Sequence, residues 1–148
     1  MMRPNQIQQR LRAGQTVVNG WLSIPSSYLA EGMGHAGFHS VTVDMQHGVI
    51  GFTDALHMLQ ALSSTSPTPL VRVSRLDGPE IMRALDAGAY GVICPMIRNA
   101  ADAELLASSC RYPPSGTRGG GCHGYLLFER RRRVAASGTR PRPCHTGQ

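Results

Sequence analysis

The feature that most limits the fold of this 148-residue chain is a regular alternation of short apolar runs with longer helix-forming segments. The runs are rich in Val, Ile and Leu and end at polar residues, glycine or proline, which is typical of buried strands. We expect strands at residues 17–22, 41–43, 70–73 and 90–96, and helices at residues 5–13, 26–36, 52–62, 77–88 and 99–110. Because a strand followed by a helix returns to a parallel neighbour, the pattern predicts an α/β fold.

Two architectures accommodate four such units. A complete (β/α)8 TIM barrel takes about 250 residues, so four units make about half of one; a compact doubly wound sheet is the alternative. Residues 32–37 match the pattern G-x-G-x-x-G, but these glycines close a helix and lead into a strand, the reverse of their order in a dinucleotide-binding fold. We therefore predict no dinucleotide site there. The helix at residues 5–13 is expected to be a lid or a lead-in.

The formal net charge of +6 is concentrated near the end of the chain. Residues 1–118 hold nine arginines and eight acids, whereas residues 119–148 hold six arginines and one acid. Nucleic acid is therefore not favoured as a partner of the folded part. The sequence has no apolar run of membrane-spanning length, no secretory signal and no dense cysteine framework, so we expect a cytoplasmic protein without a membrane partner.

Candidate chemistry follows the run at 41–43, in the segment that contains Asp44 and His47. The carboxyl ends of parallel strands are where α/β proteins keep their sites. Asp44 could orient the imidazole and raise its basicity, which would make His47 a general base. The alternative is that Asp44 caps the following loop and His47 is an ordinary polar residue.

Arg72 interrupts the apolar run at 70–73. A strand buried on both faces rarely keeps a guanidinium without an anionic partner. Either Arg72 pairs with an internal acid such as Asp44, or it receives a carboxylate or carbonyl group of a substrate.

Several motifs together resemble the HpcH/HpaI aldolase family from about residue 5 to residue 121. They are Gly20-Trp21, Tyr28-Leu29-Ala30-Glu31, Ala36-Gly37-Phe38, Val43-Asp44-Met45-Gln46-His47-Gly48, Val71-Arg72-Val73, Asp86-Ala87-Gly88-Ala89, Pro95-Met96 and Arg111-Tyr112-Pro113-Pro114-x-Gly116-x-Arg118-Gly119. The resemblance implies a TIM-barrel enzyme, a class II pyruvate aldolase that cleaves 4-hydroxy-2-oxo acids into pyruvate and an aldehyde with the help of Mg, Mn or Co.

The resemblance also implies roles for single residues. His47 corresponds to the catalytic base, which acts through water, and Asp44 to its orienting partner. Arg72 corresponds to the arginine that holds the 2-oxo group of the substrate and offsets the enolate charge. Gln46 stands where many relatives have glutamate. Gly116, Arg118 and Gly119 look like a loop at the mouth of the site.

The family's metal ligands, a glutamate and an aspartate, lie beyond the matching segment, so we expect this chain to bind the metal poorly. We assign residues 1–121 to the N-terminal half of an aldolase barrel. Residues 122–148 form a basic tail, expected to be disordered or an aberrant, out-of-frame ending. The expected function is an aldolase impaired in this chain, with 2-oxo acid and aldehyde as partners. The alternative is a non-catalytic half-barrel for binding or assembly, such as a homo-oligomer. Its residues 130–133 could dock on nucleic acid or on acidic partners.

Overall fold

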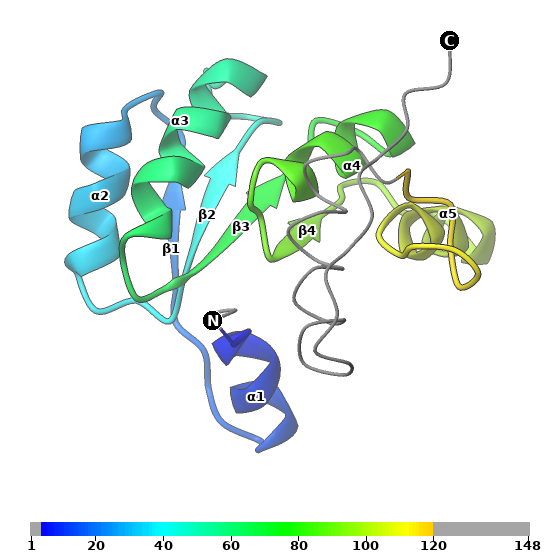
Figure 1. Ribbon diagram of the computed structural model, residues 1–148, viewed down its shortest axis with the longest axis horizontal. Coiled ribbons are helices and arrows are strands. Elements are labelled where there is room, and N and C mark those ends of the chain that lie inside the picture. Colours follow the sequence, from blue (N-terminus) through cyan, green and yellow to red (C-terminus); the bar gives the residue numbers. More distant parts are fainter. Residues whose placement is uncertain (1–3, 120–148) are drawn as a thin grey trace, which may run out of the picture. The chain divides into compact units, whose positions relative to one another are not determined.

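The computed structural model describes residues 4–119, and the compact unit that carries the helices and strands spans Asn5–Arg118 (Figure 1). The predicted alternation of strands and helices is confirmed in kind and in order. The elements are α1 (Gln6–Arg12), β1 (Asn19–Leu22), α2 (Ser27–His35), β2 (Ser40–Asp44), α3 (Phe52–Ser63), β3 (Thr68–Arg72), α4 (Gly78–Asp86), β4 (Gly91–Ile93) and α5 (Ala100–Ser109).

The four strands form one parallel sheet in the order β1-β2-β3-β4. A doubly wound sheet reverses its strand order at a switch point, whereas a barrel adds each strand beside the one before it. The sequential order within residues 4–119 therefore identifies part of a (β/α)8 barrel and rejects the doubly wound alternative.

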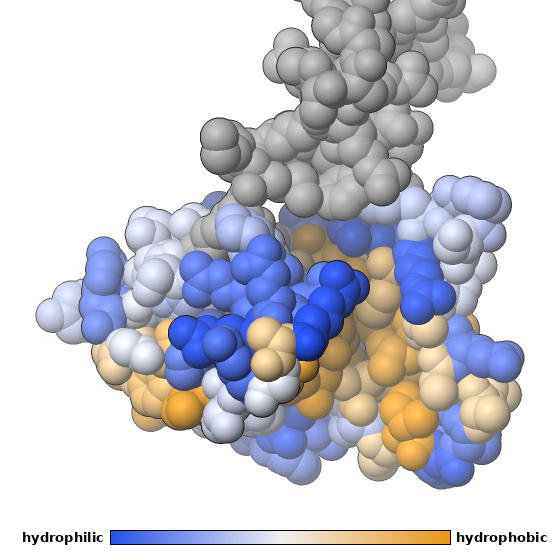
Figure 2. All heavy atoms as spheres, turned by 90° about the horizontal axis from the view of Figure 1, so that it is seen from below, coloured by the Kyte–Doolittle hydropathy of each residue, from blue (hydrophilic) through white to orange (hydrophobic). Residues whose placement is uncertain are grey.

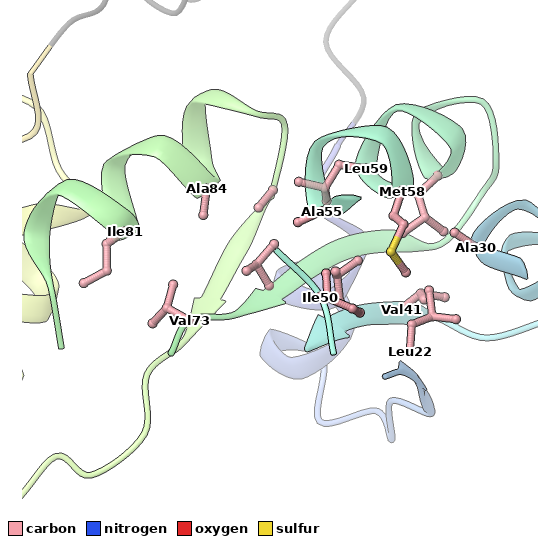
Figure 3. Packing of buried hydrophobic residues seen from close by; sticks show 14 residues of the cluster. Leu22, Ala30, Val41, Ile50, Ala55, Met58, Leu59, Val73, Ile81 and Ala84 are labelled. Atoms are coloured by element: carbon pink, nitrogen blue, oxygen red, sulfur yellow. The ribbon is translucent and has the colours of Figure 1, made fainter. Parts of the chain in front are cut away.

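Both faces of the sheet are buried at β2, where alternate residues point to opposite sides. Val43 lies in register with Val71 of β3, and both side chains are fully buried among helix residues. Figure 3 shows this packing, with Met58 of α3 lying beside Val41 of β2. The buried core comprises Leu22, Ala30, Val41, Val43, Ile50, Ala55, Met58, Leu59, Leu62, Val71, Val73, Ile81, Ala84 and Ala89.

Local sequence signals explain where the helices begin. Ser26, Asp77 and Asn99 are the N-cap residues of α2, α4 and α5, and each accepts a backbone N–H of the first turn. The strand ends match the sequence expectation less well. β4 stops at Ile93 rather than continuing to residue 96, because Pro95 has no N–H to donate to a sheet.

Two helices leave leucine side chains uncovered. α1 buries none of its residues, and Leu11 is 61% exposed. Leu105 of α5 is 48% exposed, while Leu106 packs against the core. α1 lies at the end of the sheet where the strands begin (Figure 1), and Asn5 Nδ2 donates to the Tyr90 carbonyl there. It is therefore a lead-in rather than a lid over the strand ends that carry the candidate site.

The surface of the described part also leaves apolar side chains uncovered. Figure 2 shows hydrophobic residues grouped beside hydrophilic ones on the face seen from below Figure 1. No helix within residues 4–119 combines the length and the apolar character that a bilayer crossing needs.

The predicted tail at 122–148, with its arginine cluster at 130–133, lies outside the described residues.

Candidate active site at the carboxyl ends of the strands

An ion pair between β2 and β3 forms the centre of the candidate site. Asp44 and Arg72 end their strands as register partners. Arg72 Nε lies 2.8 Å from Asp44 Oδ1, and Nη2 lies 2.5 Å from Oδ2, so the guanidinium binds the carboxylate as a two-pronged fork. Asp44 is only 1% exposed, whereas the Arg72 side chain is 21% exposed. Arg72 thus does pair with the internal acid, while part of its surface stays open.

Trp21 of β1 completes this cluster. Its Nε1 donates to Asp44 Oδ2 at 3.0 Å, and the Arg72 guanidinium carbon lies 4.8 Å from the centre of its ring. The ring can therefore attract the cation while the indole N–H satisfies the acid. The sequence alone did not predict this role of Trp21. Strand alternation could have indicated the contact. Trp21 is the register partner of Thr42, and Thr42 and Asp44 point to the same face of the sheet.

The Asp44 carboxylate also holds the loop that carries His47. Its Oδ1 accepts the backbone N–H groups of Gln46 at 3.0 Å and of His47 at 3.2 Å. The His47 side chain is exposed, and within residues 4–119 its ring has no hydrogen bond. The expected pairing of Asp44 with the imidazole is therefore replaced by pairing with the loop backbone. Arg72, Trp21 and two amides already occupy the oxygens of the acid.

The loop is fixed at both ends to neighbouring strands. Met45 N donates to the Arg72 carbonyl at 2.9 Å, and Val49 N donates to the Ser23 carbonyl at 3.1 Å. Gly48 lies so close to the Asp44 carbonyl and to Ser23 that a Cβ there would clash with backbone atoms. His47 and Arg72 are consequently held at the same edge of the sheet, where β2 and β3 end.

The pair is ionised at neutral pH. The Arg72 guanidinium holds the pKa of Asp44 well below its ordinary value, with help from Trp21 and the two loop amides and against the opposing effect of burial. Its hydrogen bond to Asp44 likewise raises the pKa of Arg72. Asp44 is therefore a fixed anion that positions other groups, and it is a poor proton acceptor.

A divalent cation does not fit the residues around this pair. Within the range 4–119, no three His, Cys, Asp or Glu side chains gather closely enough to hold a metal ion. Both oxygens of Asp44 accept hydrogen bonds, and Glu80 accepts the backbone N–H and the hydroxyl of Ser74. The carboxylates nearest the strand ends are thus already engaged by the protein.

The loop expected at the mouth of the site lies elsewhere. Arg118 Nη2 donates to Asp86 Oδ1 at 2.6 Å, and the Arg118 guanidinium carbon lies 4.7 Å from the centre of the Tyr112 ring. Asp86 ends α4, just before β4 begins, so Arg118 sits at the opposite end of the unit from His47. Gly116 packs closely against the Arg111 and Ser108 carbonyls. Expecting Gly116 and Arg118 at the site was wrong, because α5 returns the chain to the starting ends of the strands.

Three curated relatives resemble this chain in sequence. It is 38% identical over 114 residues to the hydroxypyruvate/pyruvate aldolase of Rhizorhabdus wittichii, a match that covers 77% of this chain and 45% of that protein. It is 44% identical over 99 residues to the 2-dehydro-3,6-dideoxy-6-sulfogluconate aldolase of Pseudomonas putida, covering 67% and 39%. It is 38% identical over 117 residues to the 4-hydroxy-2-oxo-heptane-1,7-dioate aldolase of Klebsiella pneumoniae, covering 79% and 44%.

The fold has solved counterparts as well. The crystal structure of an HpcH/HpaI aldolase/citrate lyase family protein from Burkholderia cenocepacia J2315 matches with a TM-score of 0.78 and 32% identity, over 90% of this chain and 55% of that one. By contrast, the chain spans less than half the length of each of the three curated relatives described above. The family model for HpcH/HpaI aldolase/citrate lyase matches residues 18–139 and so extends past residue 121, the expected end of the resemblance. The chain belongs to the HpcH/HpaI aldolase/citrate lyase family.

Proposed function

We propose that this protein is an aldolase, a class II carbon-carbon lyase that cleaves 4-hydroxy-2-oxo acids into pyruvate and an aldehyde. The observation that supports it best is the joint position of His47 and Arg72 where β2 and β3 end. A site that forms an enolate needs a base and a fixed cation near one another. Family membership supplies the reaction class.

The relatives suggest the substrate class. Their names describe aldolases acting on a 4-hydroxy-2-oxo diacid, on a sulfonated sugar acid and on hydroxypyruvate or pyruvate. We propose that the substrate of this protein is likewise a small 2-oxo acid with a hydroxyl at carbon 4.

In the proposed cleavage, His47 takes the proton of the 4-hydroxyl group. The oxygen then forms the aldehyde carbonyl as the bond between carbons 3 and 4 breaks, and the electron pair of that bond moves to carbon 3 to give the pyruvate enolate. A proton returned to carbon 3 completes pyruvate. The exposure of the His47 side chain fits a group that must meet the substrate.

Arg72 is proposed to bind the 2-oxo group and offset the enolate charge. Its Nε and Nη2 are held by Asp44, while Nη1 has no hydrogen bond within residues 4–119. A guanidinium fixed by one acid and stacked on Trp21 can present its remaining N–H groups in a constant direction. Asp44 and Trp21 then act as positioning residues.

The family's divalent cation would supply a Lewis acid for the 2-oxo group. Because residues 4–119 offer no fitting ligand set, we propose that this chain binds the cation poorly and is impaired as an aldolase. The same observation favours a second candidate, a non-catalytic half-barrel that binds or assembles with other chains.

A pyruvate-release assay tests the proposal. The full chain is incubated with 4-hydroxy-2-oxoheptanedioate, with and without Mg²⁺ or Mn²⁺, and pyruvate is measured with lactate dehydrogenase. We expect slow release that falls at least about 100-fold in His47→Ala, because the base is gone. Release unchanged by this substitution would refute the role of His47. No release from a folded chain under any condition would favour the non-catalytic candidate.

A further inference from the structure

The sheet of the described part has two free edges. Within residues 4–119, β1 pairs only with β2 and β4 pairs only with β3, so each outer strand has no strand on its other side (Figure 1). An edge strand presents unpaired backbone N–H and C=O groups, whereas a complete barrel leaves no edge because its last strand pairs with its first. The free sides of β1 and β4 are therefore where this half-barrel offers hydrogen bonds to another strand.

The two faces of the sheet differ in character. Val41 and Val43 of β2 point to the face where residues of α2, α3 and α4 complete the apolar core. The opposite face, which lines the interior of a closed barrel and is called the lumen face below, is polar at this strand. There, Asn19 Oδ1 accepts the hydroxyl groups of Ser40 at 2.7 Å and Thr42 at 3.1 Å.

The lumen face contains a buried hydroxyl group without a partner. Thr68 of β3 is the register partner of Ser40 and therefore lies on the same face. Thr68 is 1% exposed, and its Oγ1 has no hydrogen bond within residues 4–119. Asn19, in the same row of the sheet, is exposed, and its Nδ2 has no hydrogen bond in that range either. Because buried polar atoms normally have partners, the lumen is incomplete in a single half-barrel.

Large apolar side chains are exposed beside both free edges. Ile24 in the loop after β1 is 59% exposed, and Leu29 of α2 is 40% exposed. Met96 and Ile97 in the loop after β4 are 61% and 37% exposed. Apolar surface next to unpaired strands favours another protein chain as the partner of these edges.

A second copy of the chain supplies what both edges lack. Eight parallel strands close a barrel whose interior is filled by side chains, and the described part provides four consecutive strands. Half a turn about the barrel axis brings β1 of the second copy beside β4 of the first, and β4 of the second beside β1 of the first. Residues 120–148 are too few for four more units, because the four described ones occupy residues 19–109.

We infer that two copies of this chain close one eight-stranded barrel, with β4 of each copy paired in parallel with β1 of the other. The side chains of the second copy then complete the lumen around Thr68. Both Arg72 sites lie at the same mouth of the barrel, because all eight strands run in one direction. The inference goes beyond the proposed function, since it applies equally to an active aldolase and to a non-catalytic half-barrel.

Size-exclusion chromatography with light scattering measures the mass of the full chain over a range of concentrations. We expect twice the mass of one chain. Ile24→Arg and Ile97→Asp each place a charge at one edge, and each should weaken dimerisation at least about tenfold, because the charge has no partner in the joint. Val49→Arg is the matched control. Val49 is 77% exposed in the loop after β2, a strand with neighbours on both sides, so this variant should dimerise like wild type.

The double variant Ile24→Arg/Ile97→Asp decides which edges meet. Opposite charges face each other only if β1 pairs with β4 of the other copy, and the double variant should then dimerise at least about tenfold more tightly than either single variant. A folded wild type that stays monomeric or forms assemblies larger than two, an equal loss in Val49→Arg, or no recovery in the double variant would overturn the inference. Pyruvate release judges the proposed function separately, since a dimer that releases none counts against that function alone.

Discussion

Asp44 connects three strands of this protein through one carboxylate. It receives Arg72 from β3, Trp21 from β1 and the backbone of its own loop. Removing one partner of a buried pair leaves an uncompensated charge, which costs more than the net contribution of the pair. The stability of the site thus depends on this acid remaining ionised.

Asp44→Asn should lower the free energy of unfolding by about 1.5–3 kcal/mol at pH 7, because the buried carboxylate loses its charge-assisted hydrogen bonds to Arg72 and Trp21. Urea denaturation measures this, with Glu104→Gln on the exposed face of α5 as the control, for which less than about 0.5 kcal/mol is expected. Equal stability of wild type and Asp44→Asn would show that the pair does not hold the strands together.

Lowering the pH should reduce the stabilisation that ionised Asp44 contributes to the folded protein. The folded pKa of Asp44 lies below its ordinary value of 3.8, so the contribution is complete above about pH 4 and is lost progressively as the pH falls toward the folded pKa. Denaturation at pH 7, 4 and 3 should therefore show the gap between wild type and Asp44→Asn narrowing below pH 4. A gap that widens in acid would contradict the assigned direction of the pKa shift.

At the scale of elements, α2 illustrates how packing assigns different roles to similar residues. Gly34 faces the turn just after α3, where an added Cβ would overlap the Thr65 side chain, while Gly32 has open space around its Cα. Both belong to the G-x-G-x-x-G match, and both lie inside α2 rather than at the start of a helix. The motif therefore reflects helix packing at Gly34 and, at Gly37, a positive φ in the turn that leads to β2, and not a nucleotide-binding loop.

This contrast gives a matched pair of substitutions. Gly34→Ala should destabilise the protein by about 1–3 kcal/mol, because the added methyl group forces α2 away from Thr65 in the turn after α3. Gly32→Ala should stabilise it by about 0.5–1 kcal/mol, because alanine is the better helix former. Thermal unfolding monitored by circular dichroism compares them. Shifts of the same sign would mean that the α2–α3 contact is not as close as described.

The elements were largely predictable from sequence because their signals are local. Hydrophobic periodicity located the four strands and five helices, and Ser26, Asp77 and Asn99 marked helix starts. The strand order, the contact of Trp21 with Asp44, and the position of Arg118 beside Asp86 depend on how units pack together. No local pattern carries that information, so these needed coordinates.

At the scale of the whole molecule, the composition changes abruptly near Gly119, although the family match runs to residue 139. Residues 119–148 hold six arginines and one acid, and the alternation of apolar runs with helix-forming segments does not continue there. We propose that the residues after Gly119 derive from a shifted reading frame. Reading the coding DNA one base forward or back after codon 119 should restore a fifth strand that carries a glutamate. If neither frame encodes such a strand, this origin of the tail is refuted.

In the proposed function, His47 and Arg72 together form and stabilise a pyruvate-derived enolate. Exchange of the pyruvate methyl protons for deuterium, followed by ¹H NMR in D₂O with the full chain, measures enolate formation without any aldehyde. We predict exchange above the buffer rate that falls at least about tenfold in His47→Ala and in Arg72→Lys, with Arg12→Lys unaffected. Exchange at the buffer rate with folded wild-type protein, or exchange that survives both site substitutions, would contradict it.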